Sequence, residues 1–297
     1  MAVVTASRTV RAPSTDAAAR LRQIRAILKY ALLLLIGLVA LTPFILAFLG
    51  TFKTDAEIIA YPPTFLPKAW LVGNWARTWA TDLGAGATFP RWLLNTAVVS
   101  VGSAMLQVVF CSMAAYAYAR LKFPGKDIIF SFMLASMMIP GALTLIPAYV
   151  VMTKLSLVNT YGSLLIPGAI SAGNIFLLTQ FLKAVPRELE EAAFVDGASR
   201  FRIYKDVVIP LARPAMLTVF ILQFQGMWNA FLAPLLYLNT AKMWVLNVAL
   251  TVFQQQYKAQ WNLTLVAAMF NAIPVLILFA FFSRYYIEGI SYSGLKG

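Results

Sequence analysis

The chain has 297 residues, of which 61% are hydrophobic and only 12% are charged, and its mean hydropathy is +0.76. Soluble globular domains are typically about 45–50% apolar and about 25% charged, so this composition indicates a protein that folds in lipid. The net charge of +13 does not indicate a nucleic-acid partner, because the basic residues lie between apolar runs and no zinc-finger, RRM or KH pattern occurs. With one cysteine, Cys111, and no histidine, the chain is not expected to be an enzyme, and we predict no catalytic, cofactor-binding or metal-binding residue.

The first segment, residues 1–29, is expected to form an N-terminal tail. Between Asp16 and Tyr30, apolar side chains fall roughly along one face with arginines between them. This pattern is typical of an interfacial helix that leads into a first membrane span. Simple anchoring is the main interpretation, and a regulatory or partner-binding role is the alternative.

Six runs free of Asp, Glu, Lys and Arg follow, and each is long enough to cross a bilayer, which takes about 20 residues of helix. They cover residues 30–52, 92–119, 128–153, 155–182, 214–241 and 259–283. The first run is too long for a signal-peptide core and is interpreted as a retained anchor. In the third run, Pro140, Gly141 and Pro147 predict a break or kink at membrane depth. The sequence therefore predicts an all-α integral membrane protein with a six-span domain over residues 30–283 and a tail over residues 284–297.

An even number of spans places both termini on one side of the membrane, and the basic residues indicate which side. The side that holds the termini, the loop 120–126 and the loop 183–213 carries 17 Lys and Arg residues, against 7 on the other side. Basic residues concentrate in cytoplasmic loops. Both termini and the loop 183–213 are therefore predicted to be cytoplasmic.

The loop between the fourth and fifth spans carries the most specific pattern, PRELEEAAFVDGASRFRIYKDVVIPLARP at residues 186–214. Pro186 suits the first position of a helix, and the glutamates that follow it complement the positive helix N-terminus. Gly197 suits a helix stop, where glycine adopts a positive φ at little cost. A second short helix is predicted to follow, to end at Pro210, and to give way to the fifth span at Pro214.

From the spacing alone, two interpretations of this loop remain open. In the first, Ala192 and Ala193 let a partner surface approach closely while Phe201 and Tyr204 enter a hydrophobic groove. In the second, the loop is merely amphipathic and lies on the lipid headgroups.

The loop resembles the EAA motif, EAA-x3-G-x9-I-x-L-P, of permease subunits of binding-protein-dependent ABC importers. The seven fixed positions of the motif fall in register on Glu191, Ala192, Ala193, Gly197, Val207, Ile209 and Pro210. The chain departs from the motif in having Val207 and Ile209 where the family has Ile and Leu. The resemblance to carbohydrate permeases, of the type of the second permease of the maltose transporter, extends over nearly the whole chain from about residue 28. It includes residues 51–54, 146–161, 228–229 and 294–297.

This resemblance implies that the loop 183–213 is a coupling loop, in which Glu191 meets a basic residue of a cytoplasmic ATPase subunit. It also implies a heterodimer with a second permease, two ATPase subunits that use ATP and magnesium, and an extracytoplasmic binding protein that delivers a sugar or oligosaccharide. Glycerol phosphate or a polyol is the alternative solute, because similar permeases transport them. The protein would then be a multi-pass component of a bacterial or archaeal cell membrane, with its C-terminal tail near the ATPase. No G-x4-G-K-[ST] phosphate loop occurs in the chain, so ATP hydrolysis is expected in a separate subunit.

Polar side chains inside the apolar runs are the candidates for solute contact, because polar groups in a lipid-spanning helix usually face the bundle or a watery cavity. The candidates are Gln107, Gln225, Trp228, Asn229 and Asn271. Gln107 belongs to a stripe with Thr96, Ser100 and Ser103 that is more typical of ordinary helix packing, so Gln225, Asn229 and Asn271 are the better candidates. The runs contain no charge, whereas an ion-coupled carrier, the alternative class of transporter, would need charged residues within the membrane.

Overall fold

The structure is a computed structural model that describes residues 15–83, 86–257 and 260–294. Over these residues the chain is helical and forms no strand, as the composition predicted. Three of the six largest helical units are single helices: α1 (Thr15–Gly50), α4 (Phe89–Arg120) and α14 (Trp261–Gly294). The other three consist of consecutive helices. They are α5 (Lys126–Ser136) with α6 (Gly141–Lys154); α7 (Gly162–Leu165) with η1 (Pro167–Ala169) and α8 (Ala172–Ala184); and α10 (Arg200–Ile203) with η2 (Tyr204–Val208) and α11 (Ile209–Trp228). Shorter helices connect them: α2 (Asp55–Ile59), α3 (Gly73–Ala80), α9 (Glu188–Val195), α12 (Leu232–Tyr237), η3 (Ala241–Met243) and α13 (Leu246–Gln256).

Within the described ranges, five helical stretches are long and apolar enough to cross a membrane without a sharp bend. They are Arg22–Gly50, Phe89–Arg120, Gly162–Ala184, Arg200–Trp228 and Trp261–Phe281. The third predicted span is different, because α5 and α6 meet at an angle of 104°. The prediction of six spans therefore becomes five spans and one sharply bent pair.

The bend between α5 and α6 lies where the sequence predicted it. Pro140 is the residue just before α6, and Gly141 is the first residue of that helix. Proline has no N–H to donate and its ring obstructs the preceding helical turn, so α5 cannot continue through it. Pro147, by contrast, lies inside α6. The break is therefore set by Pro140 and not by Pro147.

Two predicted span boundaries are wrong because the absence of charge does not distinguish a span from an apolar loop. The fourth span begins at Gly162 and not at residue 155, since Ser156 and Asn159 adopt positive φ angles of 56° and 63° in the loop before it. The fifth helix ends at Trp228, whereas the prediction extended to Ala241. Residues 232–241 instead form α12 and the start of η3 outside that helix.

The two ends of the chain are more helical than predicted. α1 is continuous from Thr15 to Gly50, so the described residues contain no separate interfacial helix before the first span. α14 continues to Gly294, so most of the predicted C-terminal tail belongs to the last helix. The remainder of the predicted N-terminal tail, residues 1–14, and residues 295–297 lie outside the described residues.

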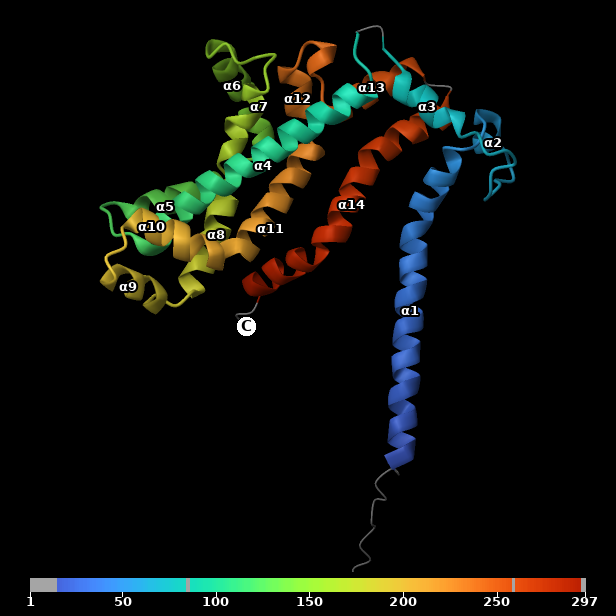
Figure 1. The fold of residues 1–297 in the computed structure, drawn as a ribbon. Helices are drawn as coiled ribbons and strands as arrows, with labels where there is room; N and C mark the ends of the chain where they lie inside the picture. Colours follow the sequence, from blue (N-terminus) through green and yellow to red (C-terminus); the bar gives the residue numbers. More distant parts are fainter. Residues whose placement is uncertain (1–14, 84–85, 258–259, 295–297) are drawn as a thin grey trace, which may run out of the picture.

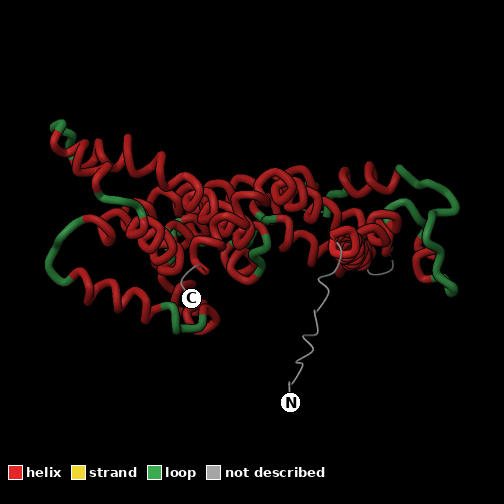
Figure 2. The backbone as a smooth tube through the Cα atoms, turned by 90° about the horizontal axis from the view of Figure 1, so that it is seen from below, coloured by secondary structure: helices red, strands yellow, loops and turns green. Residues whose placement is uncertain are grey.

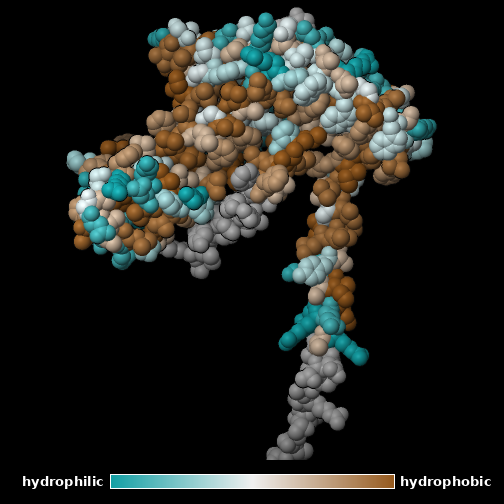
Figure 3. Space-filling model, viewed as in Figure 1, coloured by the Kyte–Doolittle hydropathy of each residue, from teal (hydrophilic) through white to brown (hydrophobic). Residues whose placement is uncertain are grey.

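The helices are arranged around α4, which packs against α8 and α11. Small side chains let these helices approach closely, among them Cys111, Ala115, Ala212 and Ala215, all almost fully buried. α14 packs on α11, while α1 stands apart and touches the rest of the chain near one end of α14 (Figure 1). Figure 2 shows the described residues from below, as helices joined by loops. None of the most apolar window of α1 is buried, and its surface is hydrophobic over much of its length (Figure 3).

Candidate functional site

The loop between α8 and α11 begins with α9, which ends at the predicted glycine. Gly197 has a φ of +83°, and the N–H groups of Gly197 and Ala198 donate to the carbonyl oxygens of Phe194 and Ala193. These bonds satisfy backbone acceptors that the end of a helix leaves free. Ser199 then caps α10 by accepting a hydrogen bond from the N–H of Arg202 at 3.3 Å. The glycine-hinged pair of short helices is present as predicted.

The prolines of the loop do not mark the helix ends that the sequence predicted. Pro186 lies before α9, which starts at Glu188, and is not its first residue. The second short helix does not end at Pro210 but continues through the π-helical turn η2 into α11, so that Pro210 lies in the first turn of α11 and Pro214 lies inside it. Proline is tolerated in a first helical turn, and a π turn is a wider coil that bonds five residues back. The second short helix, α10, is therefore joined to the fifth span without a break.

One side of α9 and α10 is open to the surroundings. Glu191 and Ala192 are exposed and Ala193 is partly buried. Beside them lie large apolar side chains with no cover: Phe194 is 56%, Val195 85% and Phe201 68% exposed. The guanidinium group of Arg200 lies 5.0 Å from the centre of the Phe194 ring. We call this set, Glu191, Ala192, Phe194, Val195 and Phe201, the coupling face, after the role that the sequence resemblance implies for the loop.

Most of the predicted coupling residues that follow Phe201 pack into the bundle. Tyr204 is only 9% exposed, its hydroxyl lies 2.7 Å from that of Ser112 on α4, and its ring lies 5.4 Å from the ring of Tyr116. Val207 and Ile209 are partly buried against the same cluster, whereas Pro210 is exposed. The prediction that Tyr204 enters a groove of a partner therefore does not fit this structure, and Phe201 is the exposed aromatic ring of the pair.

The structure contains a buried ion pair between α4 and α9 that was not predicted from the sequence. Arg120, the last residue of α4, donates from Nε to Oε1 of Glu190 on α9 at 2.5 Å, and its Nη2 donates to the carbonyl oxygen of Val185 at 2.9 Å. The two side chains are only 4% and 10% exposed. The sequence carries no local signal of this pair, because its two partners are 70 residues apart.

The polar stripe of α4 is used for packing between helices. Gln107 is 2% exposed, donates to the carbonyl oxygen of Gly168 at 2.9 Å and accepts a hydrogen bond from Asn174. Gln223 of α11 donates to Ser103 at 2.7 Å, and a Cβ on Gly168 would come within 2.7 Å of the same Ser103 oxygen. Gln107 therefore joins α4 to the interrupted α7–η1–α8 span and is not a solute contact in this structure.

The remaining candidates for the solute pathway separate into two groups. Gln225, in the last turn of α11, and Asn229, the residue that follows this helix, are exposed, and Asn229 donates to the carbonyl oxygen of Gln225 at 2.9 Å. Trp228 is buried, and its indole N–H donates to the carbonyl oxygen of Asn271 at 3.1 Å. Asn271 in turn donates to Asn247 on α13 at 3.0 Å. Trp228 and Asn271 therefore fix α11 to α14 and α13, and of the five candidates only Gln225 and Asn229 are exposed.

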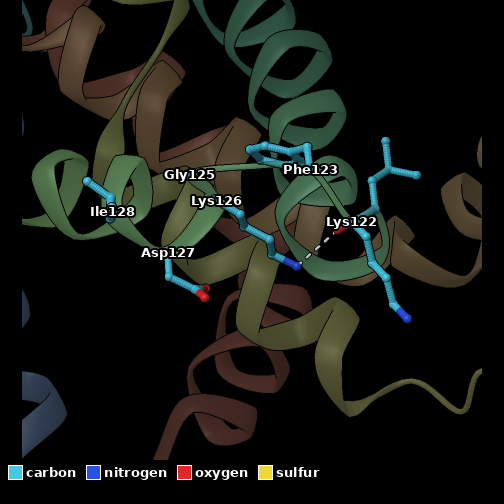
Figure 4. A pocket seen from close by; sticks show the side chains of 7 residues that line it. Lys122, Phe123, Gly125, Lys126, Asp127 and Ile128 are labelled. Atoms are coloured by element: carbon cyan, nitrogen blue, oxygen red, sulfur yellow. Dashed lines mark hydrogen bonds between the residues drawn. The ribbon is translucent and has the colours of Figure 1, made fainter.

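A shallow cavity of about 350 Å³ lies beside the loop between α4 and α5 (Figure 4). Its lining includes Lys122, Phe123, Lys126 and Asp127. The ammonium group of Lys126 donates to the carbonyl oxygen of Leu121 at 3.1 Å, so it is used to hold the loop together. None of the candidates for solute contact lines this cavity, so it is not part of the candidate solute pathway.

The structure thus defines a helical membrane protein whose interrupted bundle carries a hinged loop with an exposed coupling face. A comparison with protein families matches residues 107–289 to the binding-protein-dependent transport system inner membrane component family. The chain belongs to this family. It is therefore a transport component and not an enzyme.

Curated relatives align over most of their length. The arabinooligosaccharides transport system permease protein AraQ of Halalkalibacterium halodurans is 30% identical over 264 residues, which cover 88% of this chain and 93% of the relative. The diacetylchitobiose uptake system permease protein NgcG of Streptomyces coelicolor is 31% identical over 263 residues, with 87% and 85% covered. The sn-glycerol-3-phosphate transport system permease protein UgpE of Brucella abortus is 29% identical over 264 residues, with 87% and 94% covered.

Among solved structures, the fold is similar to a chain of a bacterial ABC transporter that imports the acidic polysaccharide alginate. The TM-score is 0.76 at 24% identity, with 94% of this chain and 100% of that chain covered. At this level of identity the likeness concerns the fold.

Proposed function

We propose that the protein is the permease subunit of an ATP-driven importer that takes up a sugar or oligosaccharide delivered by an extracytoplasmic binding protein. The observation that carries the proposal is the coupling face: an exposed motif glutamate beside uncovered apolar rings, on two short helices of which the second continues into a membrane span. An uncovered apolar patch rimmed by charge is typical of a protein-docking surface. A cytoplasmic ATPase subunit, which would bind ATP and magnesium, fits this surface. Closure of two such subunits would move α11 through its unbroken connection to α10 and drive alternating access.

A second permease subunit is the other structural requirement of the proposal. α1 packs on the rest of the chain mainly through α14, and its apolar surface is open over its length. A related permease beside α1 and lipid on the remaining surface would cover it. Gln225 and Asn229 would then face a pathway between the two permeases, where amides can hydrogen-bond the hydroxyl groups of a sugar.

Uptake in proteoliposomes that contain both permeases, the ATPase and the binding protein tests the function. We expect accumulation of an arabino-oligosaccharide or diacetylchitobiose that requires internal Mg-ATP and survives an ionophore that dissipates ion gradients. Uptake that persists without ATP and stops with the ionophore would instead identify an ion-coupled carrier. Accumulation of sn-glycerol-3-phosphate alone would keep the ATP-driven mechanism and replace the sugar, an alternative favoured by the similarity to UgpE.

The proposed topology places both termini and the loop 183–213 in the cytoplasm, and thiol labelling tests it. In a Cys111→Ser background, Val195→Cys and Tyr61→Cys introduce thiols at positions that are 85% and 96% exposed and lie on opposite sides in the proposed topology. We expect a membrane-impermeant maleimide to label position 61 in right-side-out vesicles and position 195 only in inverted vesicles. Labelling of position 195 from outside would contradict the topology.

A further inference from the structure

The buried ion pair between Arg120 and Glu190 connects two segments that are 70 residues apart in the sequence. Removing either partner would leave a buried charge without compensation, which makes such a pair costly to break. The ion pair of Arg202 and Asp206 is exposed instead of buried: the side chains are 74% and 54% accessible, and the two groups are 3.5 Å apart. Exposed pairs contribute little and exchange readily with water.

The last three turns of α4 hold the coupling loop at both of its ends. Ser112, Tyr116 and Arg120 recur at four-residue spacing and therefore share one face of α4. Arg120 binds the start of the loop through Val185 and Glu190, and Ser112 binds its far end through the hydroxyl of Tyr204. An eight-residue helix such as α9 has little stability of its own in water. Its position is therefore set by these contacts together with α10 and η2.

The opposite end of α4 is bound just as specifically to the segment before α13. The indole N–H of Trp92 donates to the carbonyl oxygen of Ala241 at 2.8 Å, and Asn95 donates to the carbonyl oxygens of Lys242 and Trp244. The hydroxyl of Thr96 accepts a hydrogen bond from the N–H of Leu246 at 2.7 Å. Figure 1 shows α4 as one continuous helix between α10 at one end and α13 at the other.

We propose that Arg120 and Glu190 are positioning residues that join the coupling loop to α4, so that a displacement of α9 is transmitted along α4 to residues 241–246. This inference rests on the proposed function, because the ATPase supplies the displacement. α11 provides one mechanical connection through the backbone, and the ion pair provides a second one through α4. α11 also reaches this region, because the side-chain amide of Asn247 donates to the carbonyl oxygen of Trp228 at 3.2 Å, so the ion pair adds to the connection through α11 and does not replace it.

Hydrogen–deuterium exchange on the complete transporter tests the second connection. In the wild-type assembly we expect trapping with Mg-ATP and vanadate to change the exchange of residues 241–246. In Glu190→Arg and in Arg120→Glu, assembled complexes should still trap nucleotide, but this change should be strongly reduced, because only the connection through α11 remains. Uptake is measured with whichever solute the wild type accumulates: the arabino-oligosaccharide, diacetylchitobiose or sn-glycerol-3-phosphate. We expect uptake per assembled complex to fall at least about tenfold, as expected for breaking a buried pair.

Charge exchange distinguishes positioning from simple disruption. The double variant Arg120→Glu/Glu190→Arg restores the attraction but not the bond to Val185, because a carboxylate cannot donate to a carbonyl oxygen. Relative to the single variants, we expect it to recover part of the exchange response at residues 241–246 and part of the uptake. The matched control, Arg202→Asp/Asp206→Arg on the exposed pair, should behave as the wild type. An unchanged response at residues 241–246 in the single variants, or no recovery in the double variant, would overturn the proposal.

A milder variant tests the proposal if charge reversal prevents assembly of the transporter. Glu190→Gln keeps the shape of the side chain and removes its charge, and we expect it to reduce the response at residues 241–246 severalfold. A full response in Glu190→Gln, or the absence of any response in the wild type, would contradict the proposal. Failure of the proposed function itself would be recognised separately, since the wild-type permease would then bind no ATPase.

Discussion

Glu191→Lys is expected to abolish the stimulation of ATP hydrolysis by the sugar-loaded binding protein, while the permease still inserts into the membrane. Glu191 is exposed in the first turn of α9 and lies beside the apolar residues of the coupling face. The resemblance to importer permeases implies a basic residue of the ATPase opposite it. Truncating one partner of a buried interfacial charge pair costs about 2–5 kcal/mol, so charge reversal should weaken productive docking at least about 30-fold.

Glu188→Lys is the matched control for this prediction. Both glutamates are exposed in the first turn of the same helix, so both substitutions place a positive charge at the positive end of α9. That effect is worth about 0.3–1 kcal/mol in each case. Glu188 lies outside the motif, and stimulated ATPase activity should therefore stay close to wild type. Equal loss in both variants would assign the effect to helix stability, and wild-type stimulation in Glu191→Lys would remove Glu191 from the coupling role.

The sequence predicted those features that depend on local chemistry. Long apolar runs identified the spans because a backbone in lipid must satisfy its own hydrogen bonds. Pro140 marked the bend between α5 and α6 because its ring and missing N–H act on its immediate neighbours. Gly197 was predicted to adopt a positive φ for the same kind of local reason, and it does.

Features that depend on contacts between distant segments could not be predicted in this way. The charge-free run after Trp228 includes α12, and only the tertiary structure shows that this apolar stretch lies outside the span. Tyr204 fits a docking surface by spacing, yet it is buried and hydrogen-bonded to the hydroxyl of Ser112, which is 92 residues away. No local pattern marks Asn247, although it binds both Trp228 and Asn271. A single sequence gives the periodicity of each helix but not the direction in which its faces pack.

Gly197→Val is expected to uncouple the transporter by a conformational route that leaves the charges of the coupling face unchanged. Among the described residues, no atom beyond the glycine and its two chain neighbours lies within 4 Å of the position where a Cβ would be placed, so packing does not oppose the substitution. The cost arises because φ is +83°, a region that β-branched residues rarely enter. A penalty of about 1–2 kcal/mol at one residue favours a different turn and changes the angle between α9 and α10.

Gly197→Asn separates this conformational cost from the mere addition of a side chain. Asparagine tolerates left-handed backbone angles better than other residues with a Cβ, so its penalty should be smaller. We therefore expect stimulated ATPase activity in the order glycine, asparagine, valine, with all three proteins assembled to the same extent. Because the loop is bound to α4 through Glu190 and Tyr204 on either side of the hinge, a changed hinge angle must strain one of these contacts or displace the coupling face. Equal activity of the asparagine and valine variants would show that the left-handed conformation of Gly197 is not required for coupling.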